Sequence, residues 1–194
     1  MQKSLTTTLL GISMTAKYIG NFYKGKWDSI IETLLIQDGD PKTIDKAFYK
    51  NVDGRFDEII DLWKSAGYDK VTTVEWINYY PDKHFENLVV EEFEKFSNTK
   101  CARAWISRIR PGKYAPIHKD IDDNIEEYLK QGELVRYSIF ISQPHPGGVF
   151  IFNNHCFHCE PSGNVYEWDH YQDWHAGGNC GLHDKFMFHF IGIK

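Results

Sequence analysis

The sequence predicts a mainly β protein with flanking helices, in which a helical N-terminal region supports a sandwich or jelly-roll core. The second half of the chain consists of short runs rich in β-branched and aromatic residues, separated by Gly and Pro turn signals. The first half instead carries apolar residues at helical spacing. With 194 residues we expect a single domain, with strands and supporting helices over 1–99 and the core over 100–194.

The first half divides into short elements bounded by Gly and Pro. The pattern is clearest over 56–66, where Phe56, Ile59, Ile60 and Trp63 share one helical face. The predicted elements are an extended lead-in over 1–30, a short helix over 27–36, a turn over 38–41, a helix over 56–66, a strand over 71–80 and a helix over 84–96 lying against a sheet.

The second half is predicted to contain the strands of the core, with one polar insertion. These strands are expected over 102–110, 116–121, 134–142, 148–153, 164–168 and 185–193. The insertion over 122–131 is acidic, and we expect it to be a helical loop beside the site.

A histidine and a carboxylate lie two residues apart after a Pro-Gly turn. Side chains at i and i+2 point to the same side of a strand, so His118 and Asp120 can converge on one metal ion. With a second histidine they would form a 2-His-1-carboxylate triad, which is typical of non-haem iron(II) oxygenases. We expect the third ligand downstream, on the opposite side of the barrel. The candidates are His145, His155, His158, His170 and His175.

The surroundings of His175 distinguish it from the other four candidates. It precedes a turn and a final strand, whose alternation places Lys185, Met187, His189 and Ile191 on one face. A cation therefore stands ten residues after the histidine, at the start of that strand. If this face points inward, Lys185 is buried and requires an anionic partner.

On these residues, segment 103–192 resembles the 2-oxoglutarate and iron(II)-dependent dioxygenases. The shared pattern is His-x-Asp, a distal histidine 50 or more residues later, and Arg or Lys about ten residues after that, which here are His118, Asp120, His175 and Lys185. The resemblance implies a double-stranded β-helix (jelly roll, cupin-like) core, in which 163–168 would be the penultimate strand.

The same resemblance implies the chemistry. His118, Asp120 and His175 would hold Fe(II), and Lys185 would pair with the distal carboxylate of the co-substrate 2-oxoglutarate. With O2, the enzyme would hydroxylate a peptide or protein side chain or a small molecule, and 2-oxoglutarate would be decarboxylated to succinate.

Different segments of this chain resemble different members of the family. Segment 108–120 and the lysine are most similar to prolyl 4-hydroxylases, although Ile109 stands where those enzymes usually carry a tyrosine that helps to hold the oxoglutarate. The strand over 134–141 is similar to the arginine-bearing strand of aspartyl/asparaginyl β-hydroxylases, which makes Arg136 a second candidate oxoglutarate contact. The overall texture also resembles oxygenases encoded by phages of cyanobacteria.

Other interpretations stay open from sequence. The protein could be a metal-binding cupin-like protein without oxygenase activity, but such a protein has no need of a cation at Lys185. A zinc site could form from His155, Cys156, His158 and Cys159 with Cys180 and His183. Candidate pocket residues are Trp105, Tyr114, Tyr137, Trp168 and Trp174, and Asn153 and Asn179 are candidates for orienting ligands.

Composition narrows the classes of function. The formal net charge of −5 disfavours binding to nucleic acid through a basic surface, which also disfavours a nucleic-acid demethylase. Four cysteines without a secretory signal indicate a reduced, cytoplasmic protein, in the host cytoplasm if it is phage-encoded. No apolar run approaches the roughly 20 residues of a membrane span, so we expect no membrane partner.

Overall fold

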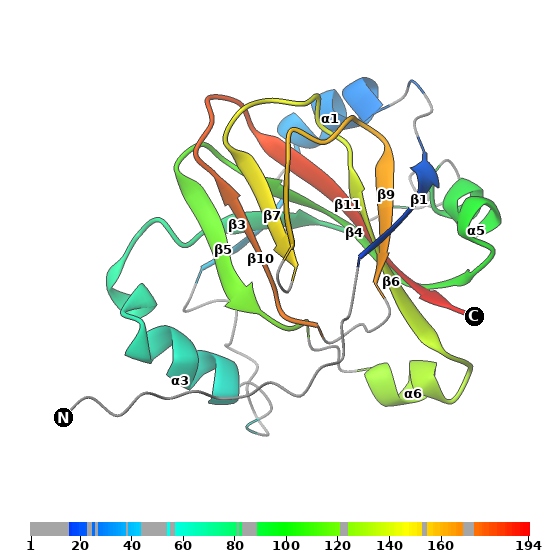
Figure 1. The fold of residues 1–194 in the computed structure, drawn as a ribbon, viewed down its shortest axis with the longest axis horizontal. Coiled ribbons are helices and arrows are strands. Elements are labelled where there is room, and N and C mark those ends of the chain that lie inside the picture. The colour runs from blue at the N-terminus through cyan, green and yellow to red at the C-terminus, as the bar shows by residue number, and fades with distance from the viewer. Residues whose placement is uncertain are drawn as a thin grey trace.

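The computed structural model contains two antiparallel sheets stacked face to face (Figure 1). It describes residues 16–22, 25, 27–37, 39–43, 54, 57–80, 82, 89–120, 124–152, 155–168 and 173–194. The larger sheet has the strand order β1-β9-β6-β11-β4-β3-β2, and the smaller has the order β5-β10-β7-β8. The strands are β1 (Lys17–Asn21), β2 (Asp40–Lys42), β3 (Trp76–Tyr79), β4 (Lys100–Ile109), β5 (Lys113–His118), β6 (Leu134–Phe140), β7 (Gly148–Phe152), β8 (His155–His158), β9 (Asn164–Trp168), β10 (His175–Asn179) and β11 (Lys185–Ile193).

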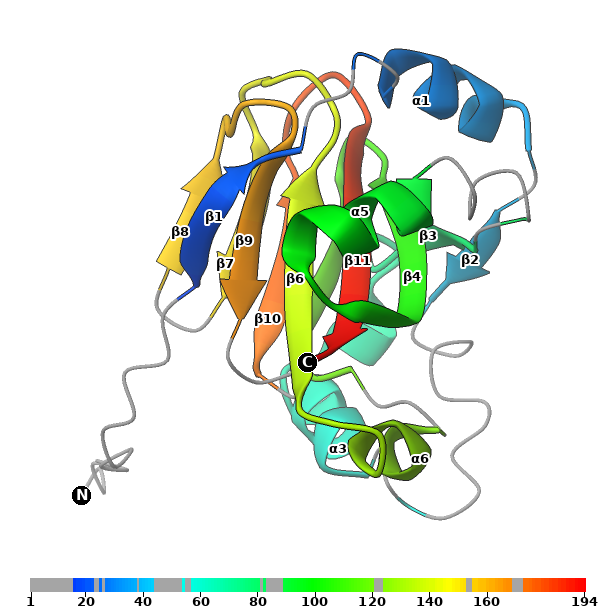
Figure 2. The same ribbon diagram turned by 90° about the vertical axis from the view of Figure 1, so that its right-hand side faces the viewer.

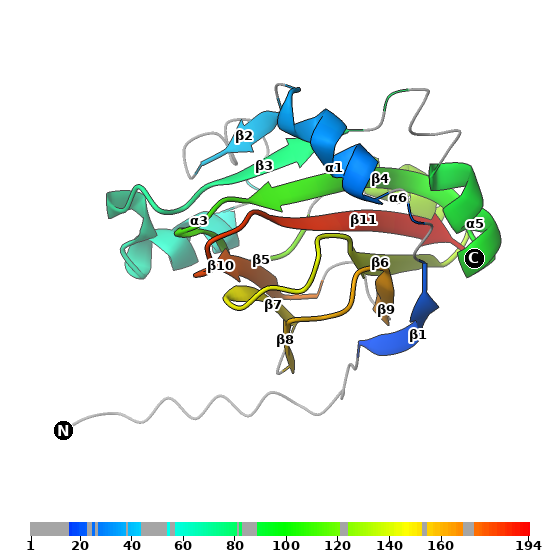
Figure 3. The ribbon, with the colours of Figure 1, turned by 90° about the horizontal axis from the view of Figure 1, so that it is seen from above.

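The last eight strands form the jelly roll. The chain crosses repeatedly between the sheets, so that β4, β6, β9 and β11 lie in the larger sheet and β5, β7, β8 and β10 in the smaller one. Figure 3 shows the two layers edge-on. This connectivity of eight strands in two sheets is that of a cupin-like double-stranded β-helix, which confirms the predicted fold class. Strands β1, β2 and β3 extend the larger sheet at its two edges.

Two helices cover the outer face of the larger sheet. They are α1 (Trp27–Leu35) and α5 (Glu91–Ser97), and Figure 2 shows α5 lying over β6, β11 and β4. Alternate residues of β11 point to this face, where Phe188 packs against Trp27 and Phe93 at ring-centroid distances of 5.9 and 5.7 Å. Each such buried aromatic side chain contributes about 1.5–3 kcal/mol. The outer face is therefore a hydrophobic core, and the other face of β11 is left for the space between the sheets.

Of the other three described helices, the first two in chain order lie beside β5 of the smaller sheet, and the last packs against the larger sheet. These are α3 (Asp57–Ser65), a 3₁₀ helix over Tyr68–Lys70, and α6 (Ile125–Leu129). The indole Nε1–H of Trp63 on α3 donates a hydrogen bond of 2.6 Å to the carbonyl of Ile117. This bond attaches α3 to the end of β5, one residue before His118. No described helix has the length and apolarity needed to cross a membrane.

Most predicted elements are present within one to three residues of their expected bounds. The helix predicted over 84–96 is α5 in its described part, because 83–88 lie outside the described residues. The insertion predicted over 122–131 contains α6, and 121–123 lie outside that part of the chain. The lead-in includes β1, which pairs with β9, while residues 1–15 are likewise outside it.

The structure corrects several of the predicted strands and turns. The strand expected over 71–80 is shortened to β3, because residues 72 and 73 form a turn before it. Of the turn expected over 38–41, Asp40 and Pro41 instead belong to β2, which pairs with β3, and residue 38 lies outside the described residues. The segments 155–158 and 175–179 were not predicted as strands, yet they are β8 and β10. Strand 163–168 is therefore not the penultimate one, since β10 follows it.

Candidate metal centre

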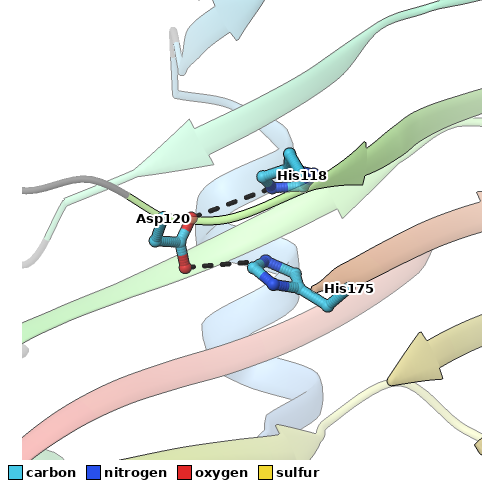
Figure 4. Close-up of side chains that lie close together, drawn as sticks. All are labelled: His118, Asp120 and His175. Carbon is cyan, nitrogen blue, oxygen red and sulfur yellow. Dashed lines mark ion pairs between the residues drawn. The ribbon is translucent and has the colours of Figure 1, made fainter. Parts of the chain in front are cut away.

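The structure brings His118, Asp120 and His175 together, as the spacing predicted. One ligand atom from each residue can be chosen so that all three lie within 4.8 Å of one another. The Nε2 atom of His118 is 3.8 Å from Oδ1 of Asp120, and Nε2 of His175 is 3.6 Å from Oδ2 (Figure 4). In the part of the chain that the structure describes, no other group of three or more His, Cys, Asp or Glu side chains is gathered in this way.

The two histidines lie on neighbouring strands, which differs from the expected arrangement. His118 ends β5 and His175 begins β10, and the two residues are paired directly across the ladder, with ring centroids 4.2 Å apart. The expectation of a ligand on the opposite side of the barrel was therefore wrong. Asp120 lies two residues beyond the end of β5, not on the strand. The β5–β10 register shifts between His175 and Gly177, and such an irregularity re-aims side chains beside a site.

Backbone carbonyls fix the orientation of both imidazole rings. Nδ1 of His118 lies 2.6 Å from the carbonyl oxygen of Pro116, and Nδ1 of His175 lies 2.9 Å from that of Asp173. A carbonyl can only accept, so each Nδ1 carries the proton and each Nε2 keeps a free lone pair. The lone pairs face Asp120. This is the arrangement in which proteins usually present histidine ligands to a metal.

Burial keeps both imidazoles neutral at physiological pH. Desolvation lowers the pKa of His118 to about 4, and the positive charge of Arg136 acts in the same direction. Desolvation also lowers the pKa of His175 well below its ordinary value. The apolar walls are indole rings, since Trp76 stacks on His118 at 5.7 Å and Trp168 packs edge-on against His175 at 5.0 Å. Two neutral imidazoles and a carboxylate fit Fe(II), because metal ligands must be deprotonated.

Lys185 is buried between the sheets, as its position on β11 predicted. Lys185 is 4% exposed. Its Nζ donates a hydrogen bond of 2.6 Å to the carbonyl of Val149 on β7 and lies 5.5 Å from the ring centre of Phe150. Within the described residues no carboxylate forms an ion pair with it. A Cβ atom at Gly177 on β10 would lie 3.4 Å from Nζ. The same Cβ atom would lie 2.9 Å from Cδ1 of Ile109, so a larger residue at position 177 would crowd the interior beside the ammonium.

Burial of Lys185 predicts a specific pH dependence of stability. Desolvation lowers its pKa from 10.5 to about 7. Between these values the unfolded chain binds more protons than the folded one, so the free energy of unfolding rises with pH across this window, by about a few kcal/mol. Urea unfolding at pH values from 6 to 10 measures this rise. It should be absent from the Lys185→Met variant, and equal pH slopes in the two proteins would contradict the burial of a titrating ammonium.

Arg136 is also buried between the sheets. It lies on β6, its residue is 1% exposed, and its guanidinium lies over Trp105 and Trp168 at 4.8 and 4.6 Å from their ring centres. Its Nη1 forms an ion pair with Oδ2 of Asp120. The sequence had suggested Arg136 as a contact for 2-oxoglutarate. It gave no indication that Arg136 would also pair with Asp120, the predicted metal ligand.

His189 is a polar residue of the interior to which sequence reasoning gave no role. Its Nε2 lies 2.9 Å from Oγ of Ser107, and its Nδ1 lies 3.4 Å from both Nη2 of Arg136 and Oγ of Ser138. The alternation of β11 had placed it on the same face as Lys185, which was the available signal. His189 therefore contacts Nη2 of Arg136, whereas Asp120 pairs with Nη1.

Some other residues proposed from the sequence have a structural role or lie outside the described residues. Asn179 donates to the carbonyls of Ile109 and His183 and accepts from the amide of Gly181, so it fixes a turn. Tyr137 packs on the outer face of the larger sheet, away from the metal centre. Asn153 and His170 lie outside the described residues.

The remaining aromatic candidates lie at different places around the site. Trp174 carries the ammonium of Lys119 over its ring at 4.6 Å, and Tyr114 packs against Tyr68 at 5.9 Å. The proposed zinc ligands do not gather, because their ligand atoms form no cluster of three. These are His155, Cys156, His158, Cys159, Cys180 and His183.

Comparisons with known proteins give distant structural similarities. The chain is similar to the viral collagen prolyl hydroxylase vCPH from Paramecium Bursaria Chlorella virus-1, with 14% identity and a TM-score of 0.44 over 92% of this chain and 96% of that one. A Pseudomonas putida prolyl-4-hydroxylase has 10% identity and a TM-score of 0.41, over 87% and 100%. A predicted oxalate decarboxylase from Thermotoga maritima has 15% identity and a TM-score of 0.38, over 62% and 82%.

No protein-family model matches the sequence, and no curated protein matches it. Similarity at the level of these structures bears on neither activity nor substrate. The chemistry is therefore inferred from the side chains of the site.

Proposed function

We propose that the protein is an Fe(II)- and 2-oxoglutarate-dependent oxygenase that hydroxylates a peptide or protein side chain or a small molecule. The observation that carries this proposal is the convergence of His118, Asp120 and His175 in a barrel that also buries Lys185. A triad of this kind leaves coordination positions open for a co-substrate and O2. A buried ammonium between the same sheets supplies the charge needed to bind an anionic co-substrate.

The three ligands would hold Fe(II) without a change of protonation. Both imidazoles are already neutral, and their Nδ1–H bonds to backbone carbonyls keep Nε2 directed at the carboxylate. When bound, Fe(II) supplies the oxidising chemistry with O2 and 2-oxoglutarate, which is converted to succinate and CO2. The protein orients the reactants and limits access of water through the indole walls beside the two histidines.

Lys185 would bind the distal carboxylate of 2-oxoglutarate. Without an anion its pKa is lowered to about 7, because burial penalises the charged form. A carboxylate in contact with Nζ would favour the ammonium and raise that pKa, so binding should take up part of a proton near pH 7. The suggestion that Arg136 also contacts 2-oxoglutarate stays a prediction.

Other residues of the chain bear on the substrate class and the compartment. The segment over 108–120 and Lys185 favour a prolyl 4-hydroxylase-like enzyme over an aspartyl/asparaginyl hydroxylase-like one, and a phage origin rests on sequence texture alone. A cytoplasmic location is supported by the free thiols of Cys101, Cys156, Cys159 and Cys180.

Turnover of 2-oxoglutarate tests the reaction class. Succinate release from 2-oxoglutarate can be followed directly in protein supplied with Fe(II) and O2. Formation of succinate that requires Fe(II) and O2, and that stops when Zn(II) replaces iron, is the expected result. Retention of metal with no succinate under any of these conditions would favour the metal-binding cupin-like protein without oxygenase activity.

A further inference from the structure

We propose that Arg136 is a positioning residue that holds the carboxylate of Asp120 in place to receive the metal ion. This inference rests on the proposed metal centre and adds to it a residue from the other sheet. Arg136 lies on β6 in the larger sheet, whereas Asp120 follows β5 of the smaller one. The ion pair between Nη1 and Oδ2 is therefore a contact across the interior of the jelly roll.

The guanidinium of Arg136 is itself held rigidly. It lies between the rings of Trp105 and Trp168, at 4.8 and 4.6 Å from their centres, and its side chain is 1% exposed. On the side of His189, Nη2 lies 3.4 Å from the imidazole Nδ1. A planar cation stacked between aromatic faces keeps its N–H groups in fixed directions, which a flexible ammonium does not. Arg136 can therefore hold in place a carboxylate, that of Asp120, which lies outside the β ladders.

Asp120 needs such a partner. It lies beyond the last residue of β5, so no ladder fixes it, and its side chain is 28% exposed. Its Oδ1 faces Nε2 of His118, while its Oδ2 faces both Nε2 of His175 and the guanidinium. If Arg136 holds Oδ2, the carboxylate plane is set and Oδ1 remains directed toward the lone pair of His118. The two imidazoles are fixed by carbonyls, and Arg136 gives the third ligand an equivalent support.

Charge and positioning make opposite predictions for this residue. A cation beside a metal site repels the metal ion, so removing the charge should strengthen metal binding if only electrostatics mattered. It should also strengthen binding if Arg136 competed with the metal for Asp120. Loss of a positioning contact should weaken binding instead, typically 10- to 100-fold. The sign of the change therefore separates the interpretations.

Titration of metal-free protein with Co(II), followed by the visible absorption of the bound ion, measures the affinity in the parent and in Arg136→Gln. We expect the variant to bind Co(II) about 10- to 100-fold more weakly. The matched control is Arg108→Gln, which also removes an arginine that is ion-paired with a carboxylate, Asp184, but that packs over Phe186 and forms no ion pair with Asp120 in the described part of the chain; its Co(II) affinity should be unchanged. Arg136→Lys keeps the charge and loses the planar fork, and it should also bind more weakly than the parent.

A second control separates positioning from loss of the fold. Ile139→Ala opens a cavity on the outer face of β6, where Ile139 is fully buried and does not reach the metal centre. This variant should unfold at a lower temperature and keep the parent affinity for Co(II). Equal or tighter binding in Arg136→Gln would overturn the proposal for Arg136 alone. A parent protein that binds no Co(II) would overturn the metal centre and this inference together.

Discussion

Replacing Asp120 by alanine is expected to abolish Fe(II)-dependent conversion of 2-oxoglutarate to succinate. The substitution removes the only anionic member of the triad and leaves two neutral imidazoles, which bind a divalent cation far more weakly. It also leaves Arg136 without its carboxylate, so an uncompensated cation would face the site. The loss of metal affinity should exceed the 10- to 100-fold that typically follows removal of an outer contact. Succinate release and Co(II) titration measure the two effects.

Asp184→Ala provides a matched control for this variant. Asp184 is a partly buried carboxylate of similar exposure, 21% against 28%, and it too is ion-paired with an arginine, Arg108. It is not a member of the triad, so its loss should leave metal affinity at the parent value. If Asp120→Ala retained parent turnover, or if both variants lost it equally, the assignment of Asp120 as a ligand would be wrong.

Replacing Lys185 by methionine is expected to weaken 2-oxoglutarate binding while leaving metal binding nearly unchanged. Methionine keeps much of the volume of the buried stem and removes the ammonium that would meet the distal carboxylate. Truncating one partner of a buried charge pair costs about 2–5 kcal/mol, which corresponds to a loss of about 30-fold or more in affinity. Calorimetric titration of the metal-loaded protein with 2-oxoglutarate, in the absence of O2, measures the change.

Lys113→Met is the control for loss of a lysine elsewhere on the barrel. Lys113 begins β5, its side chain is 28% exposed, and it contacts Thr72 and Glu75. Its replacement should leave 2-oxoglutarate affinity unaltered. Unchanged affinity in Lys185→Met would transfer the anion contact to Arg136, and the Arg136→Gln variant would then have to show the loss instead.

The convergence of His118 with Asp120 and the burial of Lys185 could be predicted from the sequence because both depend on local periodicity, whereas His175 was selected by its position before Lys185 and by the family resemblance. His118 and Asp120 are two residues apart, and alternation along β11 places Lys185 on the inner face whichever strands lie beside it. The aromatic and β-branched composition of β11 also made its strand conformation predictable.

Strand β10 could not be predicted, because its sequence His-Ala-Gly-Gly-Asn contains no strong strand former. It forms a strand because β5 and β7 pair with it on both sides, so tertiary context decides its conformation. The same context places His175 directly beside His118, whereas the order of residues had suggested opposite sides of the barrel. One of the two glycines of this strand, Gly177, lies next to Lys185, and a Cβ atom added there would lie 3.4 Å from Nζ.

The contact between Arg136 and Asp120 was beyond prediction for a different reason. Arg136 lies on β6 of the larger sheet, whereas Asp120 follows β5 of the smaller one. Their contact depends on how the sheets stack and on the indole rings that direct the guanidinium. Alternation on β6 could place Arg136 on the inner face with Ser138, but it could not identify the partner. Side-chain partners across an interior follow from packing, which a single sequence does not display.

Anaerobic titration of the metal-free protein with Fe(II) and then with 2-oxoglutarate tests the central claim most directly. Chelation of 2-oxoglutarate by iron held in the triad should give a weak visible charge-transfer band that requires both additions and is absent from the His175→Ala variant. A protein that gives no band with either order of addition, and that instead retains Zn(II), would contradict the assignment of this site to an iron-dependent oxygenase.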